Sequence, residues 1–291
     1  MKKLLYSLLI LLAGLTACKQ EGQEKKTVKK PIQERADGKL FIVGGGGQPH
    51  SLVKSLVQIS GADTTGYAVI LPMSSSVPDT SAFYADKRFR KAGVDEIVTY
   101  NIQDASAVQP ARLDSIKNAR LIYMTGGDQR RFMDIVRGTK VQEAIQQAFL
   151  DGTTVSGSSA GAAVMSKKMI TGDEKKHPEY TGDFRTIEAN NMIIKEGVGL
   201  LENVIVDQHF VKRMRMNRLL TVVIEYPGYT GVGIDESTAI LVQGNKAEVF
   251  GESQVIVIRN PNQGVRKKND LLAAQDLLLG VYVPGETFYL E

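Results

Sequence analysis

The sequence predicts an α/β protein whose mainly parallel β-sheet is flanked by helices on both faces, with a small antiparallel part at the C-terminus. Three observations support this fold class. Short apolar runs alternate with longer stretches of helical spacing, and several of these runs end in glycine or polar residues. Beyond residue 244 the alternation changes to short strand-like segments, which indicates antiparallel pairing at one edge.

The first expected strand is the apolar run 40–43, which ends in four consecutive glycines. Leu52, Leu56 and Ile59 then recur at helical spacing, so residues 51–60 are expected to form an amphipathic helix. The same alternation continues through the first half of the chain. The strands expected there are 67–71, 96–100, 121–124 and 154–155. The helices expected between them are 81–91, 110–118 and 141–150.

The second half of the chain is less regular. Residues 172–186 are polar, so this segment is expected to be an exposed excursion. An apolar strand at 204–206 ends in polar residues. Residues 160–166 and 270–279 are expected to be helical.

Composition excludes several classes of function. Lysine and arginine number 36 against 32 acidic residues, and a formal net charge of +4 gives no reason to expect nucleic-acid binding. The single cysteine cannot form an internal disulfide, and the three histidines form no cluster with zinc-ligand spacing. No metal site is therefore expected.

The N-terminus predicts export. Lys2 and Lys3 precede an apolar stretch at 4–15, which is too short to span a membrane comfortably. It ends in Leu-Thr-Ala-Cys, and this resembles the bacterial lipobox, in which the cysteine, here Cys18, is acylated. A lipid on Cys18 would hold the protein outside the cytoplasm, in the periplasm or at the cell surface; an ordinary signal peptide is the alternative. The expected parts are a lipoprotein signal peptide at 1–17, a flexible tether at 18–38 and a single catalytic domain at 39–291.

The strongest local motif is Gly157-Ser158-Ser159-Ala160-Gly161, which fits the pattern G-x-S-x-G. A predicted strand precedes it and small residues follow, as at a nucleophile elbow, where glycines let the chain turn sharply. In that geometry Ser159 is a nucleophile lifted clear of the sheet, and the Ala160 amide can point at an oxyanion. The alternative is a small-residue helix packed closely on a strand.

A serine nucleophile needs a base. His177 lies in a charged segment and His50 has no acidic neighbour, whereas His209 ends an apolar strand, where parallel sheets place their sites. His209 is therefore the predicted base, against the alternative of a structural histidine. The carboxylate that orients it is expected at Asp235 or Glu236, which local sequence does not separate. The order serine, histidine, acid argues against a lipase or esterase of the α/β-hydrolase type.

A set of motifs between residues 40 and 240 carries a family resemblance. They are F-I-V-G-G-G from Phe41, T-G-G-D-Q from Thr125, G-S-S-A-G-A from Gly157, D-Q-H-F-x-x-R-x-R-x-x-R-L from Asp207 and G-I-D-E-S-T-A from Gly233. With them the chain resembles the cyanophycinase family, serine peptidases on the class I glutamine-amidotransferase-like, or flavodoxin-like, fold. The D-Q-H-F segment is the most specific of these motifs.

The resemblance implies a triad of Ser159, His209 and Glu236, with Gly127 and Ala160 as amide donors to the oxyanion and with no metal or organic cofactor. The family hydrolyses cyanophycin, a poly-aspartate chain with arginine joined to each β-carboxyl by an isopeptide bond, and releases β-aspartyl-arginine dipeptides. The substrate-binding residues expected on this basis are Asp128, Gln129, Asp207, Gln208, Arg213, Arg215 and Arg218.

The three arginines suit a substrate that carries carboxylates, because a guanidinium binds a carboxylate through two parallel hydrogen bonds. A solvated basic helix face is the alternative. The expected partners are cyanophycin or an aspartyl peptide, and a membrane reached through the lipid on Cys18; a homodimer is left open. The rival functions are an aspartyl or β-aspartyl dipeptidase of the same group and a non-catalytic peptide-binding lipoprotein.

Overall fold

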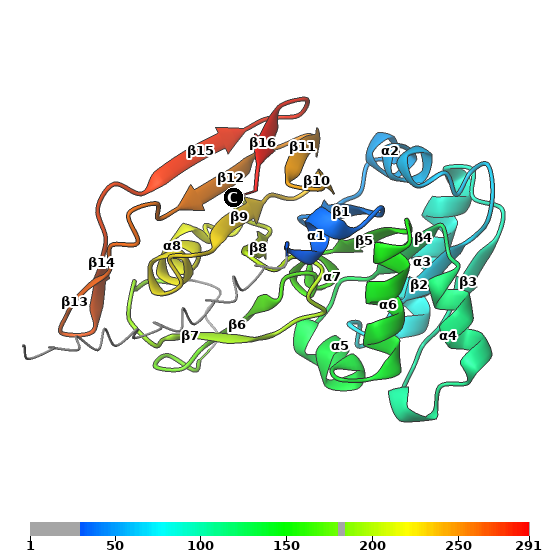
Figure 1. The fold of residues 1–291 in the computed structure, drawn as a ribbon, viewed down its shortest axis with the longest axis horizontal. Coiled ribbons are helices and arrows are strands. Elements are labelled where there is room, and N and C mark those ends of the chain that lie inside the picture. The colour runs from blue at the N-terminus through cyan, green and yellow to red at the C-terminus, as the bar shows by residue number, and fades with distance from the viewer. Residues whose placement is uncertain (1–29, 180–183, 291) are drawn as a thin grey trace, which may run out of the picture.

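The computed structural model describes residues 30–179 and 184–290, and its largest sheet has eight strands. Five neighbouring strands of that sheet are parallel: β1 (Lys39–Val43), β5 (Thr154–Ser158), β4 (Leu121–Met124), β2 (Ala68–Leu71) and β3 (Ile97–Thr99). Three antiparallel strands extend the β1 edge: β10 (Thr238–Gln243), β11 (Lys246–Gly251) and β16 (Thr287–Tyr289). The complete order is β16-β11-β10-β1-β5-β4-β2-β3 (Figure 1).

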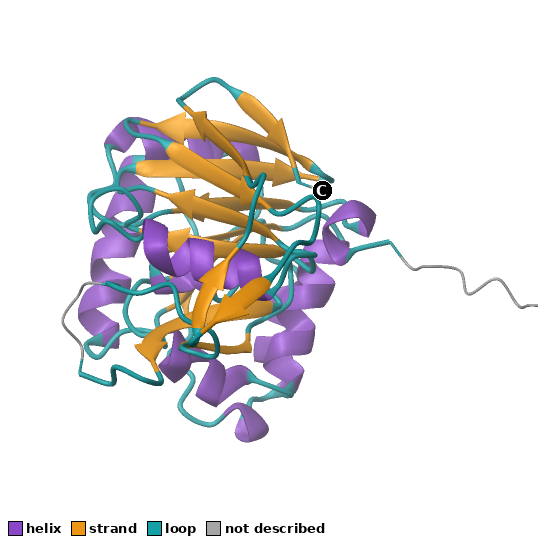
Figure 2. Cartoon of the chain, turned by 90° about the vertical axis from the view of Figure 1, so that its left-hand side faces the viewer, coloured by secondary structure: helices purple, strands orange, loops and turns teal. Residues whose placement is uncertain are grey.

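Successive residues of a strand point to opposite faces of a sheet, and β1 shows how this divides the core. Leu40 and Ile42 belong to the apolar cluster on one face, whereas Phe41 and Val43 belong to the cluster on the other. The helices packed in the first cluster include α4 (Pro110–Lys117) and α6 (Lys140–Leu150). The helices packed in the second are α2 (His50–Ser60) and α3 (Pro78–Lys91). Helices therefore flank both faces of the large sheet (Figure 2).

A second sheet, on the left in Figure 1, has four strands among the described residues. Its order is β15 (Leu278–Tyr282), β12 (Val255–Arg259), β9 (Thr230–Ile234) and β8 (Val204–Gln208). Strands β8 and β9 are parallel and are joined through helix α8 (Met216–Glu225), whereas β12 pairs antiparallel with both of its neighbours. Two small ladders complete this side: β6 (Lys168–Glu174) with β7 (Met192–Glu196), and β13 (Arg266–Lys268) with β14 (Leu271–Ala273).

The parallel strands of the large sheet bring their carboxyl ends to one edge. There β1 runs into four glycines, β4 runs into Thr125, and β5 runs into Ser159 and the short helix α7 (Ala160–Ala163). The second sheet contributes the residues that follow β8 and β9, including His209 and Glu236. The remaining helices are α1 (Ile32–Arg35), α5 (Gln129–Val136) and the 3-10 turn η1 (Ala105–Ala107).

The expected fold class is confirmed, but one expected helix is wrong and a second is shorter than expected. Residues 270–279 contain β14 and the start of β15, and their exposed leucines pair across short antiparallel ladders instead of facing a core. The helix expected at 160–166 ends at Ala163. The carbonyls of Val164 and Met165 accept hydrogen bonds from residues 198, 200 and 201, so they cannot continue it.

Two expected boundaries also shift. The end of the tether expected at 18–38 is ordered on the domain, because α1 places the side chain of Ile32 in the core and buries Gln33. The polar segment 172–186 begins inside β6 and includes the buried Phe184, so it is only partly exposed. The signal peptide expected at 1–17 and Cys18 lie outside the described residues.

Within the two described ranges, none of the helices combines the length and the apolar character that crossing a membrane requires. Those ranges also contain no group of three or more histidine, cysteine, aspartate or glutamate side chains placed to hold a metal ion.

Candidate active site

Ser159 stands at a sharp turn between β5 and α7, with backbone angles φ 54° and ψ −110°. Such angles strain a residue with a side chain, and strain of this kind is concentrated at functional sites. The turn needs the glycines on either side of it. A Cβ at Gly157 would lie 2.3 Å from the carbonyl oxygen of Gly161, and one at Gly161 would lie 2.1 Å from that of Met124.

His209 follows β8 and touches Ser159 across the gap between the two sheets. Its Nε2 lies 2.8 Å from Ser159 Oγ, and its Nδ1 lies 2.7 Å from Oε1 of Glu236. The carboxylate can only accept, so Nδ1 carries the proton and Nε2 is free to accept one from the serine. Ser159, His209 and Glu236 therefore form one continuous chain of hydrogen bonds.

The surroundings of His209 favour its neutral form. Burial lowers the pKa of the imidazole below its ordinary value, and the positive charges of Arg213 and Arg215 lower it further, while the hydrogen bond to Glu236 acts in the opposite direction. The net shift is downward. A neutral imidazole is the form that can remove a proton from a hydroxyl group.

The geometry separates the two adjacent carboxylates that local sequence leaves equivalent. Glu236 contacts the histidine, whereas Asp235 accepts hydrogen bonds from the Lys212 amide at 2.9 Å and from the Ser253 hydroxyl at 2.7 Å. Asp235 therefore fixes the loops around the site and Glu236 faces the imidazole.

The glycine-rich loop after β1 holds all three parts of the site together. Three consecutive carbonyl oxygens accept backbone hydrogen bonds: that of Val43 from Ser159 at 3.0 Å, that of Gly44 from His209 at 2.8 Å and that of Gly45 from Ser237 at 3.0 Å. The loop also lies directly against the side chains. A Cβ at Gly45 would lie 2.5 Å from the His209 ring, and one at Gly46 would lie 2.7 Å from Glu236. Sequence reasoning noticed this loop but assigned it no role at the site.

The two amides expected to face an oxyanion lie at the same edge. Gly127 has φ 141°, and a Cβ there would lie 2.1 Å from the carbonyl oxygen of Ser74, so the position admits only glycine. Ala160 follows the serine directly at the start of α7. In the described part of the chain, neither amide donates a hydrogen bond to a protein acceptor.

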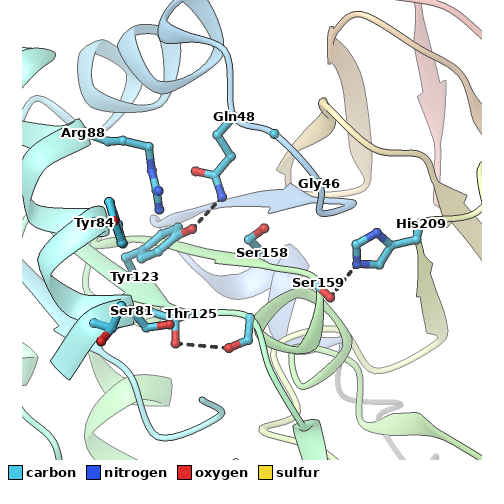
Figure 3. Close-up of a pocket in the computed structure, with 13 residues that line it drawn as sticks. Gly46, Gln48, Ser81, Tyr84, Arg88, Tyr123, Thr125, Ser158, Ser159 and His209 are labelled. Atoms are coloured by element: carbon cyan, nitrogen blue, oxygen red, sulfur yellow. Dashed lines mark hydrogen bonds between the residues drawn. The ribbon is translucent and has the colours of Figure 1, made fainter. Parts of the chain in front are cut away.

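A cavity of about 410 Å³ opens beside the serine and the histidine (Figure 3). Besides Ser159 and His209 it is lined by Gln48 from the loop before α2, by Tyr84 and Arg88 from α3 and by Tyr123 from β4. Gln48 donates a hydrogen bond of 2.8 Å to the Tyr123 hydroxyl. None of these four residues was expected at the site from the sequence. Tyr123 belongs to an apolar run that looks like core, and Tyr84 and Arg88 lie in a stretch that indicates only a helix.

Most of the residues expected to bind substrate form a buried network behind His209. The Arg218 side chain is 2% exposed, pairs with the carboxylate of Asp207 and donates a 2.9 Å hydrogen bond to Oε1 of Gln208. The guanidinium of Arg215 donates to the backbone carbonyl and side-chain oxygens of Gln208 at 2.7 and 2.6 Å. These four side chains are buried, bonded to one another and absent from the lining of the cavity beside Ser159, so their contact with substrate stays a prediction.

None of the other three expected residues lines the cavity beside Ser159 either. Gln129 is buried and donates its amide hydrogens to the carbonyls of Ile170 and Thr171, so it too is held inside the protein. Asp128 caps α5 and pairs with Arg130; burial alone would raise its pKa, but the hydrogen bonds and charge of Arg130 lower it overall. Arg213 is exposed, and its charge acts on His209.

The other two histidines lie where the sequence places them. His50 is exposed at the start of α2. His177 is half exposed and lies 3.2 Å from a carboxylate oxygen of Glu188. Neither lines the cavity beside Ser159.

Comparison with known proteins gives concordant matches. The sequence profile of peptidase family S51 matches residues 40–250. The cyanophycinase of Nostoc sp. strain PCC 7120 is 28% identical over 278 residues, which cover 92% of this chain and 90% of that protein. The cyanophycinase of Synechococcus elongatus is 31% identical over 231 residues, which cover 76% of this chain and 69% of that protein.

Solved structures share the fold. The crystal structure of a peptidase from an acI-B1 Actinobacterium superposes with a TM-score of 0.65 at 22% identity and covers 89% of this chain and 99% of that one. A putative peptidase E protein from Listeria monocytogenes superposes with a TM-score of 0.50 at 16% identity, over 74% of this chain and 99% of that one.

Proposed function

Because the chain belongs to peptidase family S51 and is a cyanophycinase-like serine-type peptidase, we propose that it hydrolyses cyanophycin through Ser159, His209 and Glu236. The observation that supports this most is the unbroken chain of hydrogen bonds from the serine hydroxyl through the imidazole to the carboxylate. Two cyanophycinases each match over 92% of this chain, so their substrate is the first to test.

The proposed reaction begins with proton transfer from Ser159 Oγ to Nε2 of His209 as Oγ attacks the scissile carbonyl carbon. The resulting imidazolium is stabilised by Glu236. The oxyanion accepts hydrogen bonds from the amides of Gly127 and Ala160, and such a donor contributes about 3 kcal/mol to transition-state stability. His209 then passes the proton to the leaving amine, and water hydrolyses the acyl-enzyme by the same route in reverse order.

The products define which bond is cut. A β-aspartyl-arginine dipeptide still contains its isopeptide bond, so the serine must attack the main-chain carbonyl between successive aspartate residues. Each turnover then breaks one backbone amide, consumes one water and leaves a new carboxylate and a new amine. Every substrate unit retains the α-carboxylate and the guanidinium of its arginine.

The first test incubates the purified protein with insoluble cyanophycin and analyses the soluble products by mass spectrometry. We expect β-aspartyl-arginine from the wild-type chain and none from Ser159→Ala. Hydrolysis of free aspartyl dipeptides without release from the polymer would identify an aspartyl dipeptidase. Equal turnover by Ser159→Ala would refute the triad, and absence of covalent labelling of Ser159 by a serine-directed reagent would favour a non-catalytic peptide-binding protein.

We also propose that a lipid on Cys18 anchors the chain outside the cytoplasm. The support is the tetrapeptide Leu-Thr-Ala-Cys after a short apolar stretch, with the only cysteine of the sequence at its end. Cells that express the chain with a labelled fatty acid should yield labelled wild-type protein and unlabelled Cys18→Ala. Equal labelling of both would refute the anchor.

A further inference from the structure

One cationic side chain enters the cavity beside Ser159 without a partner of its own. Arg88 extends from α3 into the space shown in Figure 3, where Ser159 and His209 line the opposite side of the view. Its Nε atom is buried and has no hydrogen-bond partner among the described residues. In the described part of the chain, no carboxylate lies within ion-pair distance of its guanidinium.

Two other arginines near the site are already paired. Arg130 binds Asp128 and Asp173, and Arg218 binds Asp207. On α3 itself, the exposed Arg90 donates to Asp86 at 2.9 Å. A buried guanidinium donor left without an acceptor is unfavourable, and native proteins satisfy such groups with few exceptions. Arg88 is therefore a cation in the lining of the cavity whose buried Nε still needs an acceptor.

The lining of the cavity favours an anion as the missing partner. Among its described residues there is no aspartate or glutamate, whereas hydroxyl groups are frequent. The Tyr123 oxygen accepts its hydrogen bond from Gln48, so its own hydrogen is available to a second acceptor. The unsatisfied nitrogen of Arg88 is Nε, which together with one terminal nitrogen forms the edge that binds a carboxylate through two parallel hydrogen bonds.

We propose that Arg88 binds a carboxylate of the substrate and thereby selects the residue that lies next to Ser159. This inference rests on the proposed peptidase function of the same cavity. The chemical class it defines is a peptide with an anionic group in the unit that occupies the cavity. Cyanophycin offers two such groups, the α-carboxylate of each arginine and the carboxylate that ends the poly-aspartate chain.

The test measures kcat/KM of the full chain on a synthetic trimer of β-aspartyl-arginine. We expect Arg88→Met to lower kcat/KM by about 10- to 100-fold, as the loss of a charge-assisted hydrogen bond predicts. Arg88→Lys should recover part of the loss, because it restores the charge without the planar fork. Arg90→Met is the matched control on the same helix and should behave as wild type. Thermal unfolding of each variant checks that the fold is retained.

Two amidated trimers identify the carboxylate. One carries amides in place of the arginyl carboxylates, and the other carries an amide only at the end of the main chain. The trimer that lacks the carboxylate bound by Arg88 should be cut slowly by the wild-type enzyme, and Arg88→Met should not slow its cleavage further. If Arg88→Met cuts the unmodified trimer at the wild-type rate, or slows all three trimers by the same factor, the inference is wrong.

A second measurement does not depend on turnover. Covalent labelling of Ser159 by a neutral fluorophosphonate is followed with and without β-aspartyl-arginine as a competitor. We expect the dipeptide to protect Ser159 in wild type and Arg90→Met but not in Arg88→Met. Labelling and protection without cleavage of the trimer would refute only the proposed substrate. Equal protection of Arg88→Met and wild type, or no protection of either, would refute the role of Arg88.

Discussion

Replacing Glu236 with glutamine tests the role of its charge at nearly constant shape. The carboxylate accepts a 2.7 Å hydrogen bond from Nδ1 of His209 and faces the imidazolium that forms when Ser159 loses its proton. A hydrogen bond to a charged group contributes about 1.5–3 kcal/mol, which corresponds to about 10- to 150-fold in rate. The glutamine amide can also donate to Nδ1, which would move the imidazole proton to Nε2 and block proton transfer from the serine. With this wrong tautomer included, we expect kcat to fall by about 10³- to 10⁴-fold.

The pH profile supplies an independent readout for the same variant. The acidic limb of kcat/KM reports the pKa of the free enzyme's base, which burial lowers and Glu236 partly restores, so in wild type its midpoint should lie below about 6.5. Removing the glutamate charge removes the contribution that raises the pKa. In Glu236→Gln the imidazole of His209 should therefore stay neutral down to a lower pH. The acidic limb of the residual activity should accordingly shift to lower pH.

Asp235→Asn is the matched control, because it makes the same chemical change one residue away. Asp235 bonds the Lys212 amide and the Ser253 hydroxyl but not the imidazole, so its replacement should lower the free energy of unfolding by about 1 kcal/mol and leave kcat close to wild type. The assay is release of β-aspartyl-arginine under saturating substrate. Loss of kcat in Asp235→Asn as large as in Glu236→Gln, or a Glu236→Gln enzyme within tenfold of wild type, would refute the assignment.

Two further predictions concern the residues that support the site. Gly45→Ala should lower kcat by about 100-fold, because the new Cβ would lie 2.5 Å from the His209 ring and displace it; Gly138→Ala, also at positive φ but with open space around it, should retain activity. Arg218→Met should lower the free energy of unfolding in urea by about 3–5 kcal/mol, since it leaves the Asp207 carboxylate buried and unpaired. Arg90→Met is the control, because its ion pair with Asp86 is exposed, and its free energy of unfolding should fall by less than about 1 kcal/mol. Equal losses in the two variants would contradict the burial argument.

Much of the fold follows from periodicity, because most parallel strands are apolar runs that end at a glycine, a proline or a polar residue. The exposed C-terminal β-ladders cannot be predicted from periodicity in this way. Leu271, Leu278 and Leu279 are apolar but solvent-exposed, so their spacing reports strand pairing and not a buried face. The helix after Ser159 forms but is shorter than expected, since hydrogen bonds to residues distant in sequence end it at Ala163.

The site shows the same contrast between residues that local motifs indicate and residues that need tertiary contacts. Local motifs indicate Ser159 and His209, whose positions at strand ends are visible in the sequence. The choice between Asp235 and Glu236 needs a distance. Arginine at helical spacing looks the same whether it is buried or free, and only the structure separates the buried Arg218 from the unpartnered Arg88. Charge type can be predicted from sequence, whereas the partner of a charge depends on tertiary contacts.

The proposed triad is assembled from two sheets, and this makes its geometry a property of how they dock. Ser159 follows a strand of the large sheet, His209 follows a strand of the second sheet, and Glu236 lies where the chain crosses from the second sheet to the large one. The carbonyls of residues 43–45 bind the backbone at or beside all three positions. A small rotation of one sheet against the other would therefore change the 2.8 Å contact between serine and histidine. Substitutions in this glycine loop should thus reduce kcat by displacing the side chains of the site as well as straining the backbone, whereas substitutions in the buried Asp207–Arg218 pair should act first on stability.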